Sequence, residues 1–138
     1  MDWFTQVEAL RRGGMPLADA VYSKERLVRA EAARHPDLTP RQERVLSRDP
    51  EPLVRALIAM RPGLDPDLAD ALSYDPDAHV LRAVAARLDL TDGQRARLAR
   101  SEDAVVQSLI GRADAAAWLD GLPFAPKPAE GGRKGLFR

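Results

Sequence analysis

The 138-residue sequence contains no cysteine, which excludes disulfides and thiolate-bound metal or iron–sulfur sites within this chain. Aromatic residues make up only 5%, and the net charge at pH 7 is zero. No apolar run approaches the roughly 20 residues that span a bilayer, and the first ten residues lack the basic segment and long apolar core of a signal peptide. These absences predict a cytoplasmic protein.

A hydrophobic content of 45% with 30% charged residues is typical of a folded, globular chain. Charge is unevenly distributed along it. Residues 27–122 contain 13 Arg and no Lys against 16 Asp and Glu, a net charge of −3, whereas residues 123–138 carry a net charge of +3. A nucleic-acid-binding domain usually presents a broad basic face. The acidic balance of residues 27–122 therefore disfavours that function.

A 26-residue period organises the chain between about residues 17 and 112. Two series of helix-capping residue types recur at this spacing: Thr39, Asp65 and Thr91, and Asp49, Asp75 and Ser101. Four of the six precede proline, which suits the first helical position. Thr39 and Thr91 each have Gln three residues later, which fits a capping box. The pattern predicts two helix starts per period, ten residues apart: a longer helix, a turn, and a shorter helix.

The apolar residues predict which helix faces are buried. In the longer helix we expect an inward stripe of Leu53, Val54, Leu57 and Ile58, aligned with Val80, Leu81, Val84 and Ala85. In the shorter helix and the turn before it, leucines recur at equal spacing: Leu46, Leu72 and Leu98, and Leu38, Leu64 and Leu90. Glu31 places a charge where the other copies carry an aliphatic residue. The first copy should therefore be less enclosed at that point.

The two ends of the chain differ from the middle. A first helix is predicted over 2–12, with Asp2 as its cap and Trp3, Phe4, Val7 and Leu10 on one side. We expect one domain over 1–122, with a cap at 1–16, repeats over 17–112 and a second cap at 113–122. Trp3 and Trp118 are predicted to shield the open ends of the stack. Residues 123–138, rich in Pro and Gly, are predicted to be a flexible basic tail.

The repeated segment resembles the leucine-rich repeat variant family, a bacterial group of HEAT-like repeat proteins. The likeness is carried by three copies of a Val/Leu-Arg helix start followed by proline turns: Val28-Arg29 with His35-Pro36, Pro40 and Asp49-Pro50; Val54-Arg55 with Arg61-Pro62, Pro66 and Asp75-Pro76; and Leu81-Arg82, where Thr91 and Asp92 replace the proline turn. The resemblance implies an all-α, right-handed α-solenoid of about four repeats, in which α-helices alternate with shorter, often 3₁₀, segments. The iron–sulfur cluster of the first-described member is not carried over, because this chain has no cysteine.

One arginine per repeat is the sharpest candidate for partner binding. Arg29, Arg55 and Arg82 occupy the repeat motif, and Gln107 takes the place in the fourth copy. Neighbouring helices pack about 8–10 Å apart, so these side chains could form a ladder that binds carboxylates or phosphates. Alternatively, each arginine pairs with a carboxylate at the junction between repeats, namely Asp49, Asp75 or Asp77. The sequence leaves both possibilities open, with the structural one favoured.

Metal binding and catalysis find little support in the sequence. An acidic run precedes His79: Asp65, Asp67, Asp70, Asp75 and Asp77. Its spacing does not match a calcium-binding loop. Asp65 and Asp75 are explained as helix caps, and Asp67 and Asp77 are favoured in first helical turns by the helix dipole. His35 and His79 are the only groups with an ordinary pKa near neutrality, and neither lies in a nucleophile or metal motif. We expect no metal site, no cofactor and no enzymatic activity.

The functional hypothesis is a non-enzymatic module that binds a protein or peptide along its repeat surface, an acidic one if the arginine series makes the contact. The alternative is a nucleic-acid-binding array that uses the arginine series and the basic tail, and a small hydrolase or DNA-modifying enzyme is a third possibility. The tail could also dock on a partner through a short motif comprising Phe124, Arg133, Lys134, Leu136 and Phe137. A membrane partner is not expected, and the oligomeric state is left open.

Overall fold

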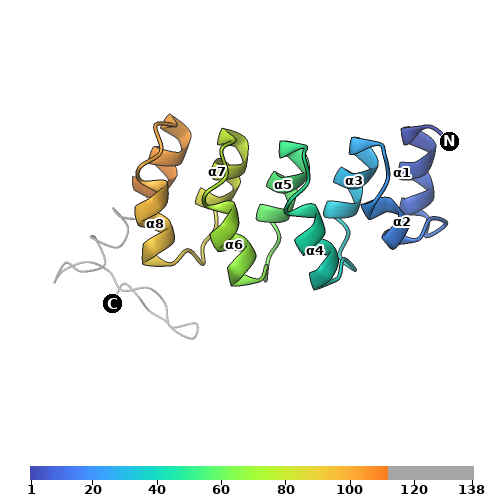
Figure 1. The fold of residues 1–138 in the computed structure, drawn as a ribbon, viewed down its shortest axis with the longest axis horizontal. Helices are drawn as coiled ribbons and strands as arrows, with labels where there is room; N and C mark the ends of the chain where they lie inside the picture. Colours follow the sequence, from blue (N-terminus) through green and yellow to red (C-terminus); the bar gives the residue numbers. More distant parts are fainter. Residues whose placement is uncertain (112–138) are drawn as a thin grey trace, which may run out of the picture.

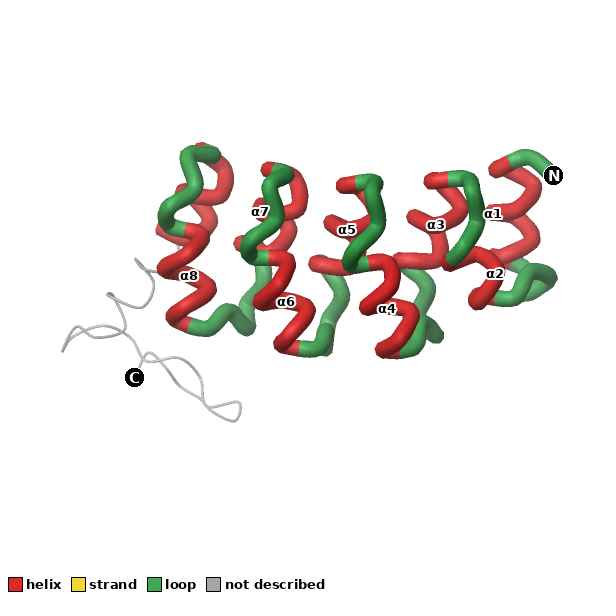
Figure 2. The backbone as a smooth tube through the Cα atoms, viewed as in Figure 1, coloured by secondary structure: helices red, strands yellow, loops and turns green. Residues whose placement is uncertain are grey.

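A computed structural model describes residues 1–111, and all regular structure within this range is helical (Figures 1 and 2). The helices are α1 (Trp3–Arg11), α2 (Leu17–Val21), α3 (Arg26–Ala33), α4 (Pro40–Leu46), α5 (Pro52–Ala59), α6 (Pro66–Leu72), α7 (Ala78–Ala85) and α8 (Asp92–Leu98). Residues 104–111 are helical as well. None of the described helices is long and apolar enough to cross a membrane. The predicted cap at 113–122 and the predicted tail lie outside the described residues.

The helices form two rows along the long axis of the molecule. In Figure 1, α1, α3, α5 and α7 lie in one row, and α2, α4, α6 and α8 lie in the other. Along the first row each helix packs against the next, and each second-row helix packs against its first-row neighbours. The starts of α3, α5 and α7 follow one another at the 26-residue period, and so do the starts of α4, α6 and α8. The prediction of an all-α fold is therefore confirmed.

The second-row helices begin as the sequence predicts. Thr39 and Thr91 form complete capping boxes with the glutamines three residues later, and Asp65 accepts a hydrogen bond from the amide of Asp67. Proline occupies the first position of α4 and α6. Helices α4, α6 and α8 have seven residues each, nearly as many as the eight of α3, α5 and α7. The sequence left open whether these shorter segments are α or 3₁₀, and in the structure they are α-helices.

The first-row helices begin later than predicted. Asp49 and Asp75 are not N-caps, because α5 and α7 start three residues further on, behind Glu51 and Asp77. Each aspartate instead accepts a hydrogen bond from the amide two residues along, at 2.9 Å in both cases. Ser23 and Ser101 make the same turn with their hydroxyls. The side chain of an Asp or Ser readily mimics a backbone turn in this way. Helices α5 and α7 therefore start more than ten residues along the chain after the starts of α4 and α6, and the predicted ten-residue offset is wrong.

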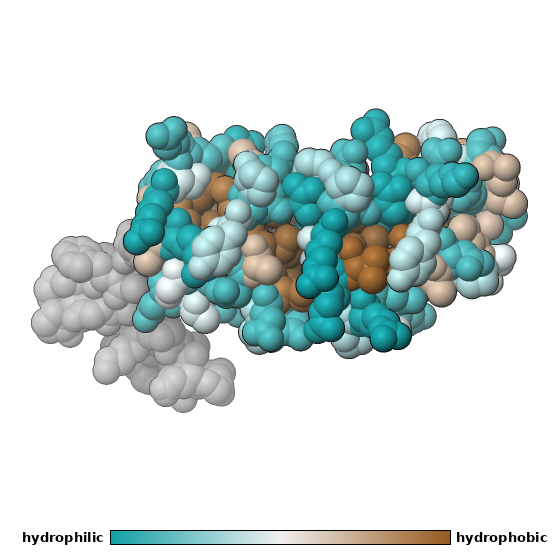
Figure 3. All heavy atoms as spheres, in the orientation of Figure 1, coloured by the Kyte–Doolittle hydropathy of each residue, from teal (hydrophilic) through white to brown (hydrophobic). Residues whose placement is uncertain are grey.

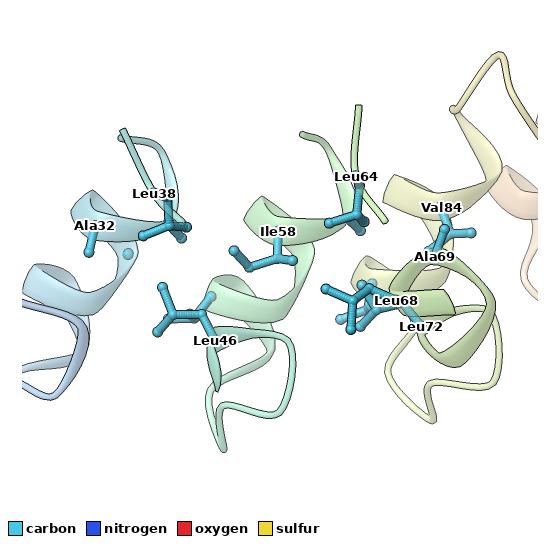
Figure 4. Packing of buried hydrophobic residues seen from close by; sticks show 14 of the residues in the cluster. Ala32, Leu38, Leu46, Ile58, Leu64, Leu68, Ala69, Leu72 and Val84 are labelled. Carbon is cyan, nitrogen blue, oxygen red and sulfur yellow. The ribbon is translucent and has the colours of Figure 1, made fainter. Parts of the chain in front are cut away.

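The buried residues of the first row keep a strict 26-residue register. Two series are fully or almost fully buried: Val28, Val54, Val80 and Val106, and Ala32, Ile58, Val84 and Ile110. Figure 4 shows Ala32, Ile58 and Val84 projecting from successive first-row helices into the same core. The predicted alignment of Val80 with Leu53 is therefore wrong by one residue. In the observed register Leu81, and not Arg82, is equivalent to Arg55.

Other apolar residues divide between the core and the surface. Leu46, Leu72 and Leu98 are buried as predicted, but Leu53 is 45% exposed. Leu53 lies about 100° around α5 from Val54, outside the buried stripe that Val54 and Ile58 form.

At the start of the chain α1 packs mainly against α3 and α2. Val7 and Leu10 are buried, whereas Trp3 and Phe4 remain exposed. The predicted four-residue apolar face of α1 is therefore only half buried, and Trp3 shields the end of the stack incompletely. The charge of Glu31 also has a partner here. Arg11 of α1 donates to both of its carboxylate oxygens, at 3.0 and 3.2 Å, so Glu31 contributes an ion pair to the contact between α1 and α3.

Candidate interaction surfaces

Arg29 lies at the junction between α3 and the turn that precedes α5. Its guanidinium donates to both carboxylate oxygens of Asp49, at 2.7 and 3.2 Å, and its remaining nitrogen donates to the carbonyl of Ser23 at 2.9 Å. The side chains are 16% and 4% exposed, so the pair is largely withdrawn from water. Hydrogen bonding to Asp49 raises the pKa of Arg29 above its ordinary value. This arginine joins two successive turns of the stack.

The same arrangement recurs one 26-residue period along the chain. Arg55 donates to both oxygens of Asp75, at 2.8 and 3.1 Å, and to the carbonyl of Asp49 at 2.7 Å. Gln107 shares the register, and its amide donates to the carbonyls of Ala99 and Ser101. Arg29, Arg55 and Gln107 thus each bind the carbonyl six residues upstream. Arg29 and Arg55 therefore make the junction contacts that are expected if these arginines have a structural role.

Arg82 departs from this register by one residue and compensates with a different carboxylate. The turn position that holds Asp49 and Asp75 is Ser101 in this copy, and Arg82 instead pairs with Asp103 at 2.7 and 3.0 Å. Hydrogen bonds from Arg82 and from the amides of the following helix lower the pKa of Asp103 to about 2. The ion pair is retained although both of its members have moved along the chain.

The lowered pKa of Asp103 predicts acid sensitivity. Its ordinary value is 3.8, so its contribution to stability is fully present above about pH 4 and is lost as the pH falls through about 2. Wild type should melt at a higher temperature than Asp103→Asn at neutral pH, and the difference should shrink towards pH 2. Thermal melts of both proteins across this range measure the effect. An equal difference at pH 7 and pH 2 would contradict it.

A second arginine series, not predicted from the sequence, joins neighbouring first-row helices. Arg61 donates to the carbonyls of Ala33 and His35, each at 2.9 Å, and Arg87 donates to those of Ala59 and Arg61, at 2.6 and 2.9 Å. Each guanidinium thereby satisfies free carbonyls at the end of the preceding helix. The 26-residue spacing of Arg61 and Arg87 was the available signal. Arg61 also pairs with Glu43, which explains how that carboxylate is accommodated when buried.

The acidic run is dispersed among structural roles. Asp65 and Asp77 accept hydrogen bonds at the starts of α6 and α7, and Asp75 holds Arg55. Asp70 accepts a hydrogen bond from Arg97, which also stacks on the Tyr74 ring at 3.8 Å from its centroid. In the part of the chain that the structure describes, no three His, Asp or Glu side chains converge as metal ligands.

Within the described residues, neither histidine side chain is hydrogen-bonded to a hydroxyl group. The ring of His35 accepts a hydrogen bond from the amide of Asp37, and His79 is exposed in the first turn of α7. The tail motif Phe124, Arg133, Lys134, Leu136 and Phe137 falls outside the described residues.

An uncovered apolar groove lies along the first row of helices. Its main residues are Trp3, Leu27, Leu53 and Leu57, and Arg11, Glu31 and Arg34 contribute to its lining. Leu27 and Leu53 occupy equivalent positions of α3 and α5 and are 37% and 45% exposed, and Trp3 is 44% exposed. The groove encloses about 240 Å³. Figure 3 shows that apolar atoms are also visible between charged side chains on one face of the molecule. Sequence analysis placed Leu53 in the core and therefore missed the groove.

A larger hollow, of about 400 Å³, lies at the turns that follow α5 and α7. Met60 and Leu88 are its exposed apolar residues, and Arg61 and Arg87 line it. Both guanidinium groups already donate to carbonyls and carboxylates. They therefore have few hydrogen-bond donors left for a ligand in this hollow.

Comparison with known proteins leaves the family undetermined. No family profile, no curated protein and no solved structure matched this chain.

Proposed function

We propose that the chain is a right-handed α-solenoid of about four 26-residue repeats, related to the leucine-rich repeat variant arrays. The constant spacing of α3, α5 and α7, and of α4, α6 and α8, supports this proposal. The recurring bonds of Arg29 and Arg55 to the turns on either side support it too, because identical contacts at identical spacing are what a stack of equivalent units produces.

We propose further that the array is a non-enzymatic, cytoplasmic module that binds a protein or peptide. The observation that carries this proposal is the apolar groove, because leucines at equivalent positions of α3 and α5 leave part of their surface exposed in one hollow beside Trp3. The arginine series is less suited to be the primary contact, since Arg29 and Arg55 are already paired. The same pairing weakens the nucleic-acid alternative.

The shape of the groove favours a peptide over a small molecule. Its volume of about 240 Å³ is below the range of ordinary small-molecule sites, roughly 300–1,000 Å³. It is suited to one or two inserted apolar side chains, as when an amphipathic helix lies in a groove and inserts anchors spaced i, i+3 or i, i+4. Arg34 is exposed beside the leucines, so a carboxylate flanking the apolar anchors would complement it.

Selection from a displayed library of random peptides tests the proposal. Wild type should enrich peptides with helically spaced apolar residues, and Leu27→Ser/Leu53→Ser should bind them roughly tenfold or more weakly, because two anchoring contacts are lost. The matched control is Leu88→Ser, which changes a fully exposed leucine outside the groove and should bind as wild type does. Equal binding by the double variant, or no enrichment by wild type, would refute this assignment of the groove.

A further inference from the structure

The exposed face of the second row carries opposite charges at equivalent positions. Arg41, Arg44 and Arg48 are exposed on α4 and immediately after it, at the helical spacing i, i+3 and i+7 that places them on one side. The equivalent positions one 26-residue period along, on α6 and immediately after it, are occupied by Asp67, Asp70 and Tyr74, all exposed. Two adjacent helices thus present a basic ridge and an acidic ridge at the same heights.

These ridges do not neutralise each other within one molecule. Among residues 1–111, no ion pair joins α4 to α6, and none involves Arg41, Arg44 or Arg48. Asp70 contacts Arg97 of α8 at 3.2 Å, yet its side chain remains 52% exposed. Within residues 1–111 the arginines of α4 and the carboxylate of Asp67 therefore face outwards without an ion pair, whereas Asp70 already pairs with Arg97.

A two-fold axis parallel to the helices and midway between α4 and α6 would match them. Rotation about such an axis places α4 of one molecule over α6 of the other and preserves height along the helix. Each arginine then meets the equivalent residue of the next period in the partner: Arg41 meets Asp67, Arg44 meets Asp70, and Arg48 meets Tyr74. Every contact occurs twice, because the interface is symmetric.

The outer helices obey the same symmetry. Tyr22, Arg48, Tyr74 and Arg100 are exposed at successive 26-residue positions, just before each turn into the first row. Under the same rotation Tyr22 meets Arg100, so each of the two tyrosines faces an arginine of the partner, a cation–π pairing. Tyr74 already has Arg97 of its own molecule on its ring, so the new contact there adds to an existing one. Between these contacts Ala18 faces Ala96, and two small side chains permit close approach.

We propose that the second-row face, defined by α2, α4, α6 and α8, is a symmetric interface between two copies of this chain. Tyr22 and Tyr74 are 71% and 65% exposed, and Tyr and Arg are the side chains enriched in protein interfaces. The pairs are solvent-exposed charges, so association is weak and sensitive to salt. The face is distinct from the apolar groove of the first row, and the two proposals can fail independently.

Sedimentation velocity of the full chain tests the interface at roughly 20 mM and about 500 mM salt, where screening differs strongly. Wild type should dimerise at the lower concentration and dissociate at the higher one. Arg41→Asp/Arg44→Asp and Asp67→Arg/Asp70→Arg should each raise the dissociation constant roughly 100-fold, because four attractive pairs become repulsive. An equimolar mixture of the two variants should dimerise again, since one now presents only acidic and the other only basic residues. Recovery in the mixture also shows that both variants are folded.

The matched control is Arg12→Asp, an exposed charge reversal that immediately follows α1, which should leave the dissociation constant unchanged. A monomeric wild type at low salt would overturn the proposal, as would double variants that dimerise as wild type does. A wild type that stays monomeric and is instead retained by single-stranded DNA in the same buffer would also overturn it, and would assign the α4 arginines to an anionic partner.

Discussion

Replacing Ile58 by alanine is expected to lower the free energy of unfolding by about 3–4 kcal/mol, as large-to-small changes at buried aliphatic sites do. Ile58 has no exposed surface and lies in the middle of the first row, where α5 packs against both α3 and α7. The substitution opens a cavity where α5 contacts both α3 and α7. If the chain is the repeat stack proposed above, in which each unit is stabilised chiefly by its neighbours, the loss should also weaken coupling along the whole array. Urea denaturation followed by circular dichroism measures both stability and cooperativity.

Leu53→Ala in the same helix is the matched control for Ile58→Ala. It removes an aliphatic side chain of the same size, but from a site that is 45% exposed, and should cost less than about 1 kcal/mol. A comparable loss of stability in both variants would show that the first row is packed differently from the described core.

Removing the Asp49 carboxylate should destabilise the protein by about 3 kcal/mol, because Arg29 would then be left largely buried without its counter-charge. Asp49→Ala also removes the acceptor for the Glu51 amide, which shapes the turn into α5. Thermal and chemical denaturation give the magnitude. Hydrogen exchange should locate the loosening at the junction between α3 and α5.

Two further variants distinguish the loss of the ion pair with Arg29 from the mere removal of a negative charge. Asp92→Ala removes a carboxylate that is almost fully exposed and pairs with Arg95, so the change in stability should be within about 0.5 kcal/mol. Replacing both Arg29 and Asp49 by apolar residues should recover part of the loss, since no buried charge then remains unpaired. If Asp49→Ala were as mild as Asp92→Ala, the arginine series would be available to a partner, as the partner-binding interpretation of the sequence holds.

The candidate surfaces were less predictable from the sequence than the fold. Helical periodicity placed Leu53 on the same apolar face of the helix as Ile58. It did not show that the buried part of that face includes Ile58 but leaves Leu53 partly exposed. The one-residue displacement of Arg82 was likewise hidden, because a Val/Leu-Arg pair occurs in either alignment. Only the partner, Asp103 in place of an aspartate at 101, shows that the ion pair moved as a unit. Arg61 and Arg87 were identifiable as a series, yet their carbonyl partners lie on the preceding first-row helix and the turn after it, far away along the chain.

What the sequence determined by itself is local: the all-helical class, the 26-residue period, and the helix starts at Thr39, Asp65 and Thr91. The helix class and the helix starts depend on hydrogen bonds and conformational preferences within a few residues of the chain, and the period is the recurrence of these local patterns. Residue types alone therefore predict them. The tertiary structure decided which arginines are paired, which leucines are left uncovered, and that α4 and α6 set opposite charges side by side. Those outcomes depend on the distances between neighbouring helices and on which side chains cover each helix face. Residues that are far apart in the sequence set both, so no single stretch of sequence predicts them.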